Sequence, residues 1–189
     1  MTILDLNKIK QGVRLVLEGI GENIEREGLR DTPARVANMY QELFWGIGED
    51  PTKVVTVTFA ENHDEMVLVK KIPFYSVCEH HLMPFVGKAH LAYIPGKEGK
   101  ITGISKLARV VEVTSRRLQV QERLTTTVAD SLVSALSPRG VLVLIEAEHF
   151  CMSMRGVSKP GTITVTSAVR GIFLTNEATR AEAMAIIRE

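Results

Sequence analysis

Residues 66–94 read MVLVKKIPFYSVCEHHLMPFVGKAHLAYI, and this stretch decides the fold. Apolar and other residues alternate over 66–77 and again over 85–94, which is the period of β-strands. In the second run four apolar side chains share one face: Phe85, Ala89, Leu91 and Tyr93. The segment between the runs ends before Pro84 and has the character of a turn. We therefore expect two strands separated by a tight bend.

Helices and further strands surround this stretch. Patterns of period two predict strands, and apolar residues at helical spacing predict helices. The expected strands are 53–60, 141–148 and 162–169, and the expected helices are 105–118, 121–136 and a last one over AEAMAIIR (181–188). The order of helices, strands, two helices, strands and helix predicts an α+β fold with a largely antiparallel sheet, not a doubly wound parallel one.

The N-terminal part of the chain is predicted to be helical. Apolar residues recur at helical spacing from Leu6, with Asp5 as N-cap and Gly28 as the stop. Thr32 and Pro33 predict the N-cap and first turn of a second helix. The segment GIGEDPTK (46–53) has the composition of a linker. We expect an N-terminal helical region over 1–48 and a second domain, which contains the strands, over 49–189.

Composition limits the classes of function. The 189 residues are 45% hydrophobic and 24% charged, which is typical of a folded globular protein. A net charge of +1 gives no global attraction to nucleic acid or to anionic membranes. No secretory signal and no stretch of transmembrane length is visible. With two cysteines, the expected compartment is the cytoplasm, where thiols stay reduced.

The candidate metal ligands lie in two segments. YSVCEHHLMPF (75–85) holds one cysteine and two histidines, and EHFCMSMRG (148–156) holds the other cysteine and a further histidine. A tight bend could direct Cys78 and a histidine at one ion, and Cys151 would complete a Cys2His set. This set suits zinc and leaves the fourth position for water. Spacing alone does not decide between His80 and His81, and a buried, inert cysteine is the ordinary alternative.

Another histidine, His90, alternates with Lys88 on the polar side of its predicted strand. This position indicates a solvated or structural role.

The sequence resembles the zinc-dependent GTP cyclohydrolase I family. The resemblance rests on CEHHLMPF (78–85), GISKLARVVEVTSRRLQVQERLT (103–125), EAEHFCMSMRGV (146–157), TSAVRGIF (166–173) and DTPARVANM (31–39). It implies a tunnelling fold, with an antiparallel sheet and paired helices, assembled as a ring decamer with active sites between subunits. It implies hydrolysis of GTP to formate and 7,8-dihydroneopterin triphosphate, at the start of folate and pterin synthesis. It also implies that His81, and not His80, joins Cys78 and Cys151 as a zinc ligand.

The resemblance assigns proton transfer to two histidines. When water adds to C8 of guanine, N7 needs a proton, and an imidazole suits this transfer near neutral pH. His149 occupies the position of the acid. His80 is the second candidate, with orientation of the site as its alternative role. Ser105 is expected to act on the ribose during ring opening.

The expected substrate contacts are also implied by the resemblance. Glu122 occupies the guanine-binding position, where one carboxylate can accept from N1–H and from the exocyclic amine. Gln121 belongs to the same substrate-binding set. The triphosphate is expected to bind a basic cluster of Lys106, Arg109, Arg155 and Arg35, with Arg35 reaching a neighbouring subunit's site. Asn38 stands where several relatives have lysine, so one phosphate contact is expected to be weaker or absent here.

Two alternatives are another enzyme of the same fold and, from a different class, a non-catalytic zinc-stabilised assembly or nucleotide-binding module. Another tunnelling-fold enzyme would be a pterin synthase, which normally holds zinc by histidines alone, or a nitrile reductase, which needs a nucleophilic cysteine without zinc. A non-catalytic zinc-stabilised assembly would require the metal for folding.

Overall fold

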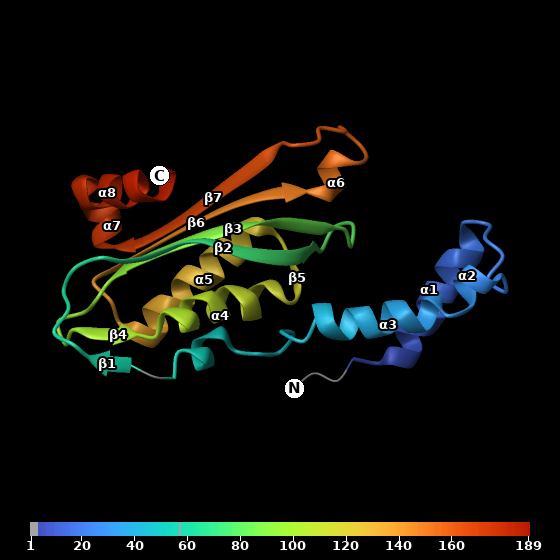
Figure 1. Ribbon diagram of the computed structural model, residues 1–189, viewed down its shortest axis with the longest axis horizontal. Helices are drawn as coiled ribbons and strands as arrows, with labels where there is room; N and C mark the ends of the chain where they lie inside the picture. The colour runs from blue at the N-terminus through green and yellow to red at the C-terminus, as the bar shows by residue number, and fades with distance from the viewer. Residues whose placement is uncertain (1–3, 57) are drawn as a thin grey trace. The chain divides into compact units, whose positions relative to one another are not determined.

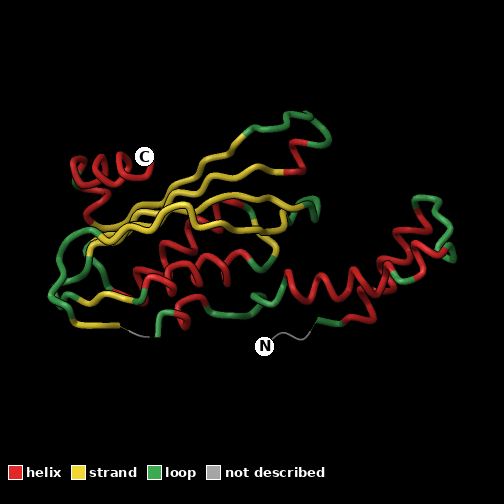
Figure 2. Tube along the Cα trace, in the orientation of Figure 1, coloured by secondary structure: helices red, strands yellow, loops and turns green. Residues whose placement is uncertain are grey.

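The computed structural model describes residues 4–56 and 58–189. The chain divides into two compact units between Glu49 and Asp50. The described part of the first unit contains helices and loops, and the second contains the strands together with further helices (Figures 1 and 2). Within the described residues, no helix combines the length and the apolar character needed to cross a bilayer.

The first unit differs from expectation at two helix boundaries. Its helices are α1 (Leu6–Gly19), α2 (Glu27–Arg30) and α3 (Thr32–Leu43). The Asp5 cap is confirmed, because its carboxylate accepts from the Lys8 amide over 3.0 Å. The extension of α1 to Gly28 is wrong: the helix ends at Gly19, and Gly21 takes a left-handed φ of 84°. The Thr32 cap is also wrong, since the Thr32 hydroxyl donates to the Gly28 carbonyl instead.

The second unit is an α+β domain, as predicted. In its described part, five strands form a sheet in the order β5-β2-β3-β6-β7. The strands are β2 (Val67–Cys78), β3 (Pro84–Ile94), β5 (Leu118–Gln119), β6 (Gly140–His149) and β7 (Ile163–Gly171). All pairs are antiparallel except the short β5, which runs parallel to β2. The helices are α4 (Ile104–Ser115), α5 (Gln121–Leu136), α6 (Phe150–Ser153), α7 (Ile172–Thr175) and α8 (Glu177–Arg188).

The strand expected over 53–60 is only partly present. Pro51–Val54 forms the 3-10 turn η1, and β1 (Thr58–Ala60) pairs with β4 (Lys100–Thr102) in a separate two-stranded ribbon. The turn forms because the Asp50 carboxylate accepts from both the amide and the hydroxyl of Thr52, at 2.9 and 2.7 Å. This local bond competes with the extended backbone that the apolar pattern predicts.

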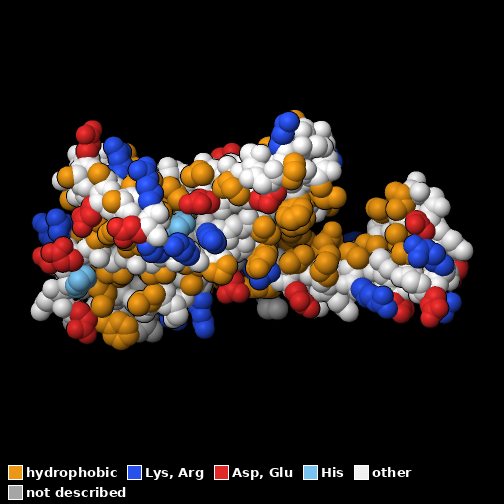
Figure 3. Space-filling model, turned by 45° about the horizontal axis from the view of Figure 1, so that its top comes forward, with side chains coloured by type: hydrophobic (Ala, Val, Ile, Leu, Met, Phe, Trp, Pro, Cys, Tyr) orange, Lys and Arg blue, Asp and Glu red, His pale blue; other side chains and the backbone are white. Residues whose placement is uncertain are grey.

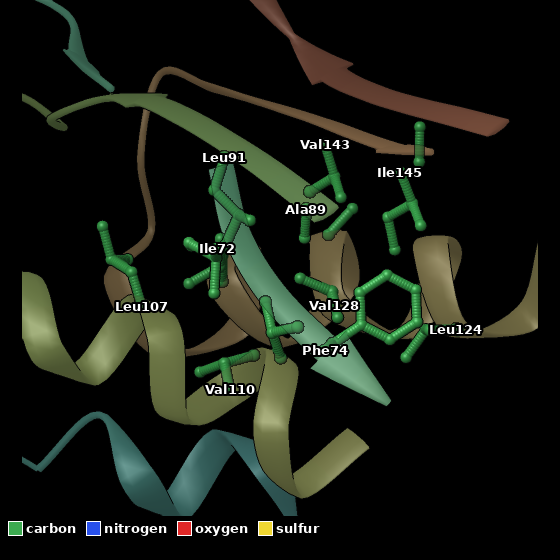
Figure 4. Packing of buried hydrophobic residues seen from close by; sticks show 14 of the residues in the cluster. Ile72, Phe74, Ala89, Leu91, Leu107, Val110, Leu124, Val128, Val143 and Ile145 are labelled. Carbon is green, nitrogen blue, oxygen red and sulfur yellow. The ribbon is translucent and has the colours of Figure 1, made fainter. Parts of the chain in front are cut away.

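The main core lies between one face of the sheet and the helices α4 and α5 (Figure 4). The strands contribute Ile72, Phe74, Ala89, Leu91, Val143 and Ile145, and the helices contribute Leu107, Val110, Leu124 and Val128. All four residues predicted to share a face of β3 are buried in this core, so the register of β3 is confirmed. A second apolar cluster covers part of the other face, where α7 and α8 pack on β3 and β6. The middle of the sheet is thus buried from both sides.

Gly87 provides a test of the packing between β3 and β6. A Cβ at this position would lie 1.9 Å from the carbonyl oxygen of Glu146 and 2.7 Å from Cα of Ala147. We expect Gly87→Ala to lower the free energy of unfolding by more than about 2 kcal/mol, because the backbones must separate. Gly12→Ala is the control: a Cβ there meets nothing within 4 Å, and alanine favours a helix by about 1 kcal/mol. Urea unfolding measures the free energy of unfolding of both variants. Equal stability of Gly87→Ala and the parent would contradict this packing.

Candidate metal centre

The turn after β2 positions two of the three candidate ligands. The Cys78 amide donates to the Met83 carbonyl over 2.8 Å, and the Leu82 amide donates to the Cys78 carbonyl over 2.9 Å. Leu82 takes a left-handed φ of 55°, which lets the chain reverse within a few residues. Cys78 is buried and His81 is exposed at the rim of this turn. The predicted bend is therefore present, and His81 lies on its open side.

An ion pair that the sequence did not reveal ties this turn to α5. The Arg123 guanidinium contacts the Glu79 carboxylate and also donates from Nε to the Gln119 side chain over 3.0 Å. The Glu79 amide donates to the Gln119 carbonyl over 3.0 Å. Arg123 and Glu79 are 44 residues apart, so no local pattern signals their contact.

The third candidate ligand comes from the end of β6. Phe85 at the start of β3 pairs with His149 at the end of β6, and the single-turn helix α6 follows directly. Cys151 in this helix therefore lies beside the turn. The ligand atoms of Cys78, His81 and Cys151 all lie within 4.8 Å of one another. The structure thus brings together the predicted Cys2His set.

The chemistry of these donors fits a divalent metal. Burial raises the pKa of the Cys151 thiol, and the adjacent Cys78 raises it further. Two neighbouring thiolates need a cation to offset their repulsion, and a bound metal supplies it. Arg155 lies 3.0 Å from Nε2 of His81. A guanidinium only donates, so Nε2 of His81 is the acceptor in this contact. Three such ligands leave one coordination position open.

His149 is held in one orientation next to the ligands. Its ring stacks on Phe85 with centroids 4.6 Å apart and an interplanar angle of 3°. Its Nε2 lies 2.7 Å from Oε1 of Gln121, whose amide nitrogen is 3.0 Å from the carbonyls of Ile145 and Thr164. Carbonyls only accept, so the amide nitrogen must face them and Oε1 must face the ring. His149 therefore carries its proton on Nε2 when neutral.

Gln121 has a different place from the one expected for a substrate contact. Its side chain is 1% exposed, and its amide bonds β6, β7 and His149 at once. It therefore positions His149 and connects the start of α5 to the sheet. The partners lie 24 to 45 residues away in the chain, so the sequence around Gln121 contains no sign of them.

Two more of the predicted residues border this centre. Burial lowers the pKa of His149, and the Glu122 carboxylate opposes that shift, which places Glu122 within electrostatic range of the ring. Glu122 is exposed in the first turn of α5. His80 is exposed beside His81, with ring centroids 6.3 Å apart in an edge-to-face arrangement.

Three predicted residues of α4, Ser105, Lys106 and Arg109, are not brought to this centre within one chain. The Ser76 hydroxyl donates to the Ser115 carbonyl over 2.7 Å, so the last turn of α4 is the part that lies near Cys78. The three predicted residues lie toward the other end of α4, roughly 9 to 15 Å from Ser115 along the helix axis at about 1.5 Å per residue. Figure 1 shows β4 and the start of α4 at the opposite end of the sheet from α6. Arg35 belongs to the first unit, where it pairs with Asp31 at 3.5 Å.

Comparison with known proteins identifies the family. Residues 9–188 match the family described as GTP cyclohydrolase I. The chain is 63% identical over 185 residues to GTP cyclohydrolase 1 of Carboxydothermus hydrogenoformans, covering 98% of this chain and 96% of that one. It is 59% identical over 188 residues to GTP cyclohydrolase 1 of Halalkalibacterium halodurans, covering 100% of each. Among solved structures, the apo archaeosine synthase QueF-Like matches with a TM-score of 0.47 and 20% identity, over 56% of this chain and 93% of that one. The chain belongs to the GTP cyclohydrolase I family.

Proposed function

We propose that this protein is a zinc-dependent GTP cyclohydrolase I that converts GTP to formate and 7,8-dihydroneopterin triphosphate, the first step of folate and pterin synthesis. The observation that carries the proposal is the convergence of Cys78, His81 and Cys151 within 4.8 Å. Cys78, His81 and Cys151 would hold the zinc ion, whose chemistry at this site would be to activate water for addition to C8 of guanine. The proposed compartment is the cytoplasm, where both thiols stay reduced.

His149 is proposed as the acid that protonates N7 of guanine. Its Nε2 proton is engaged by Gln121, so the transferred proton belongs on Nδ1. Stacking on Phe85 keeps the ring from turning away. A fixed donor contributes to the rate because it needs no reorientation when the charge develops. His80 is proposed for the later proton transfers at the opened ring and the ribose.

Glu122 is proposed to recognise guanine. Its carboxylate is exposed near His149, at the first turn of α5. A carboxylate can accept from N1–H and from the exocyclic amine together, whereas adenine lacks this donor pair. Selection for GTP over ATP therefore follows from one residue.

We propose that a second subunit completes the triphosphate site. Arg155 is already beside His81, but Lys106, Arg109 and Ser105 are toward the far end of α4 from the metal ligands. A neighbouring chain that presents the start of its α4 would supply these groups, with Arg35 as a further contribution. The proposed assembly is a ring, a decamer by its resemblance to the family, and each active site then spans a subunit boundary.

The metal requirement is tested by Cys151→Ser. We expect zinc to fall from about one per chain to well below that value and formate release from GTP to be lost, because serine is a poor zinc ligand. The fold should persist, since the main core lies between the sheet and α4 and α5. Zinc analysis, circular dichroism and a formate assay measure these effects. Met154→Ala, an exposed position in the same segment, is the control. If Cys151→Ser unfolds the chain, the zinc is structural and the catalytic proposal fails.

The acid role is tested by His149→Ala. We expect kcat to fall by about 10²- to 10⁴-fold, the usual contribution of a positioned acid, while zinc content and GTP affinity stay near the parent values. His63→Ala is a matched control, because His63 lies in the loop before β2. Turnover of GTP by His149→Ala at the parent rate would remove the residue from the mechanism.

The shared site is tested by mixing two inactive variants. We expect Cys151→Ser and Lys106→Ala chains, refolded together in equal amounts, to recover up to about a quarter of the parent activity, because some interfaces then combine two intact halves. Cys151→Ser mixed with His149→Ala is the control and should recover none, since both changes damage the same half. A mixture that stays inactive in both cases would show that one chain holds the whole site.

A further inference from the structure

A pocket opens on the face of the sheet opposite to the one that α4 and α5 cover. It has a volume of about 430 Å³ and lies between β2, β3, β6, β7 and α8. Its polar lining consists of Lys71, Lys88, His90, Glu146 and Arg188, and apolar side chains of β6, β7 and α8 complete it. None of these five residues belongs to the metal centre or to the proposed GTP contacts. Figure 3 shows Lys and Arg side chains together with hydrophobic ones on the face that carries α8.

The charges of the lining favour an anion. Three cationic side chains face one carboxylate, which leaves a local excess of positive charge in a chain whose net charge is only +1. Among the described residues, Lys71, Lys88 and Arg188 form no salt bridge within 4.0 Å. Cations held together in a concave site attract a counter-ion more strongly than the same cations spread over a surface.

His90 gives the pocket a buried polar group in need of a partner. Its side chain is 3% exposed, and neither ring nitrogen has a hydrogen-bond partner among the described residues. The nearest acid atom, Oε1 of Glu146, is 3.6 Å from Nε2, which is too long for a hydrogen bond. An imidazole always carries at least one N–H donor, and a buried donor is costly when it is unmatched. An acceptor in the pocket would satisfy it.

A β-bulge directs two consecutive lysines to this face. The pairing of β2 with β3 shifts register between Val69 and Ile72, and Lys71 takes a left-handed φ of 61°. In a regular strand Lys70 and Lys71 would point to opposite faces. Here Lys70 donates to the Ile186 carbonyl of α8 over 2.8 Å, while Lys71 lines the pocket next to the same helix. The bulge therefore adds a charge to the pocket that regular pairing would have placed elsewhere.

We propose that this pocket binds a small oxyanion of the phosphate class, held by Lys71, Lys88 and Arg188 and accepting a hydrogen bond from His90. Arginine and lysine supply charge-assisted donors for such an oxyanion, and His90 supplies a directed one. The pocket volume of about 430 Å³ exceeds that of a phosphate ion, so the pocket has room for a free phosphate or a small phosphate monoester. The proposal is independent of the cyclohydrolase activity, because the two sites share no residue.

The test is a calorimetric titration of the zinc-loaded full-length protein with inorganic phosphate. We expect one saturable site per chain that Lys88→Gln weakens by about tenfold, the equivalent of one charge-assisted contact. His90→Phe, which keeps an aromatic ring but removes the donor, should weaken phosphate binding as well. Lys97→Gln, an exposed lysine outside this pocket, is the control and should bind phosphate like the parent. Glycerol phosphate titrated in parallel distinguishes a monoester site from one for the free ion.

The outcomes separate this site from the proposed GTP site. Phosphate binding that Lys106→Gln abolishes and Lys88→Gln leaves intact would overturn the proposal, because the ion would then occupy the triphosphate site. Equal phosphate affinity of the parent, Lys88→Gln and His90→Phe would overturn it too. Absence of any phosphate binding would also overturn the proposal, and water or another part of an assembled protein would then be the partner of His90. Retained formate release by Lys88→Gln, together with weaker phosphate binding, would support a separate site.

Discussion

The antiparallel pairing of β3 with both β2 and β6 is the constraint on which the metal centre depends. Val77 pairs with Pro84 on one side of β3, and Phe85 pairs with His149 on the other. These two pairings place the C-terminal ends of β2 and β6 on either side of the start of β3, at the same end of the sheet. Cys78 and Cys151 are 73 residues apart in sequence, yet each follows from the register of β3. A slip by one residue would turn every side chain of a strand to the other face and separate the ligands.

The same end of the sheet contains a buried polar contact that joins α5, β6 and β7. Gln121 is buried, and its amide bonds a carbonyl of each of two strands as well as the ring of His149. A buried polar group with all its partners satisfied specifies one arrangement, because any alternative leaves a donor or an acceptor unmatched. The geometry of the proposed acid is therefore coupled to the docking of α5 on β6 and β7. A change that loosens this helix should disturb proton transfer before it disturbs the metal ligands.

Much of the domain follows from local patterns, and the exceptions have physical reasons. The strands around the bend and the helix over 121–136 are as predicted. In these segments the spacing of the apolar residues agrees with the faces that the tertiary structure buries. The strand expected from residue 53 fails where Asp50 stabilises a turn, and the first helix stops short at Gly19. The family resemblance assigns His81 as the metal ligand. Side-chain alternation alone would place His80 on the same face of a strand as Cys78. The positions of Gln121 and Arg123 depend on contacts across 24 to 45 residues, which no local pattern encodes.

His90 illustrates how the two faces of one strand acquire different roles. Alternation along β3 sends Ala89 and Leu91 into the main core, and it sends Lys88 and His90 to the opposite face, as the sequence indicates. His90 is nevertheless not solvated. Helix α8 packs on this face of β3 and β6, and only 3% of His90 is exposed. A histidine that would be harmless on an open sheet becomes a buried donor once a helix covers it. The C-terminal helix therefore leaves a buried N–H donor on His90 without an acceptor, and an anion held by the nearby lysines would supply one.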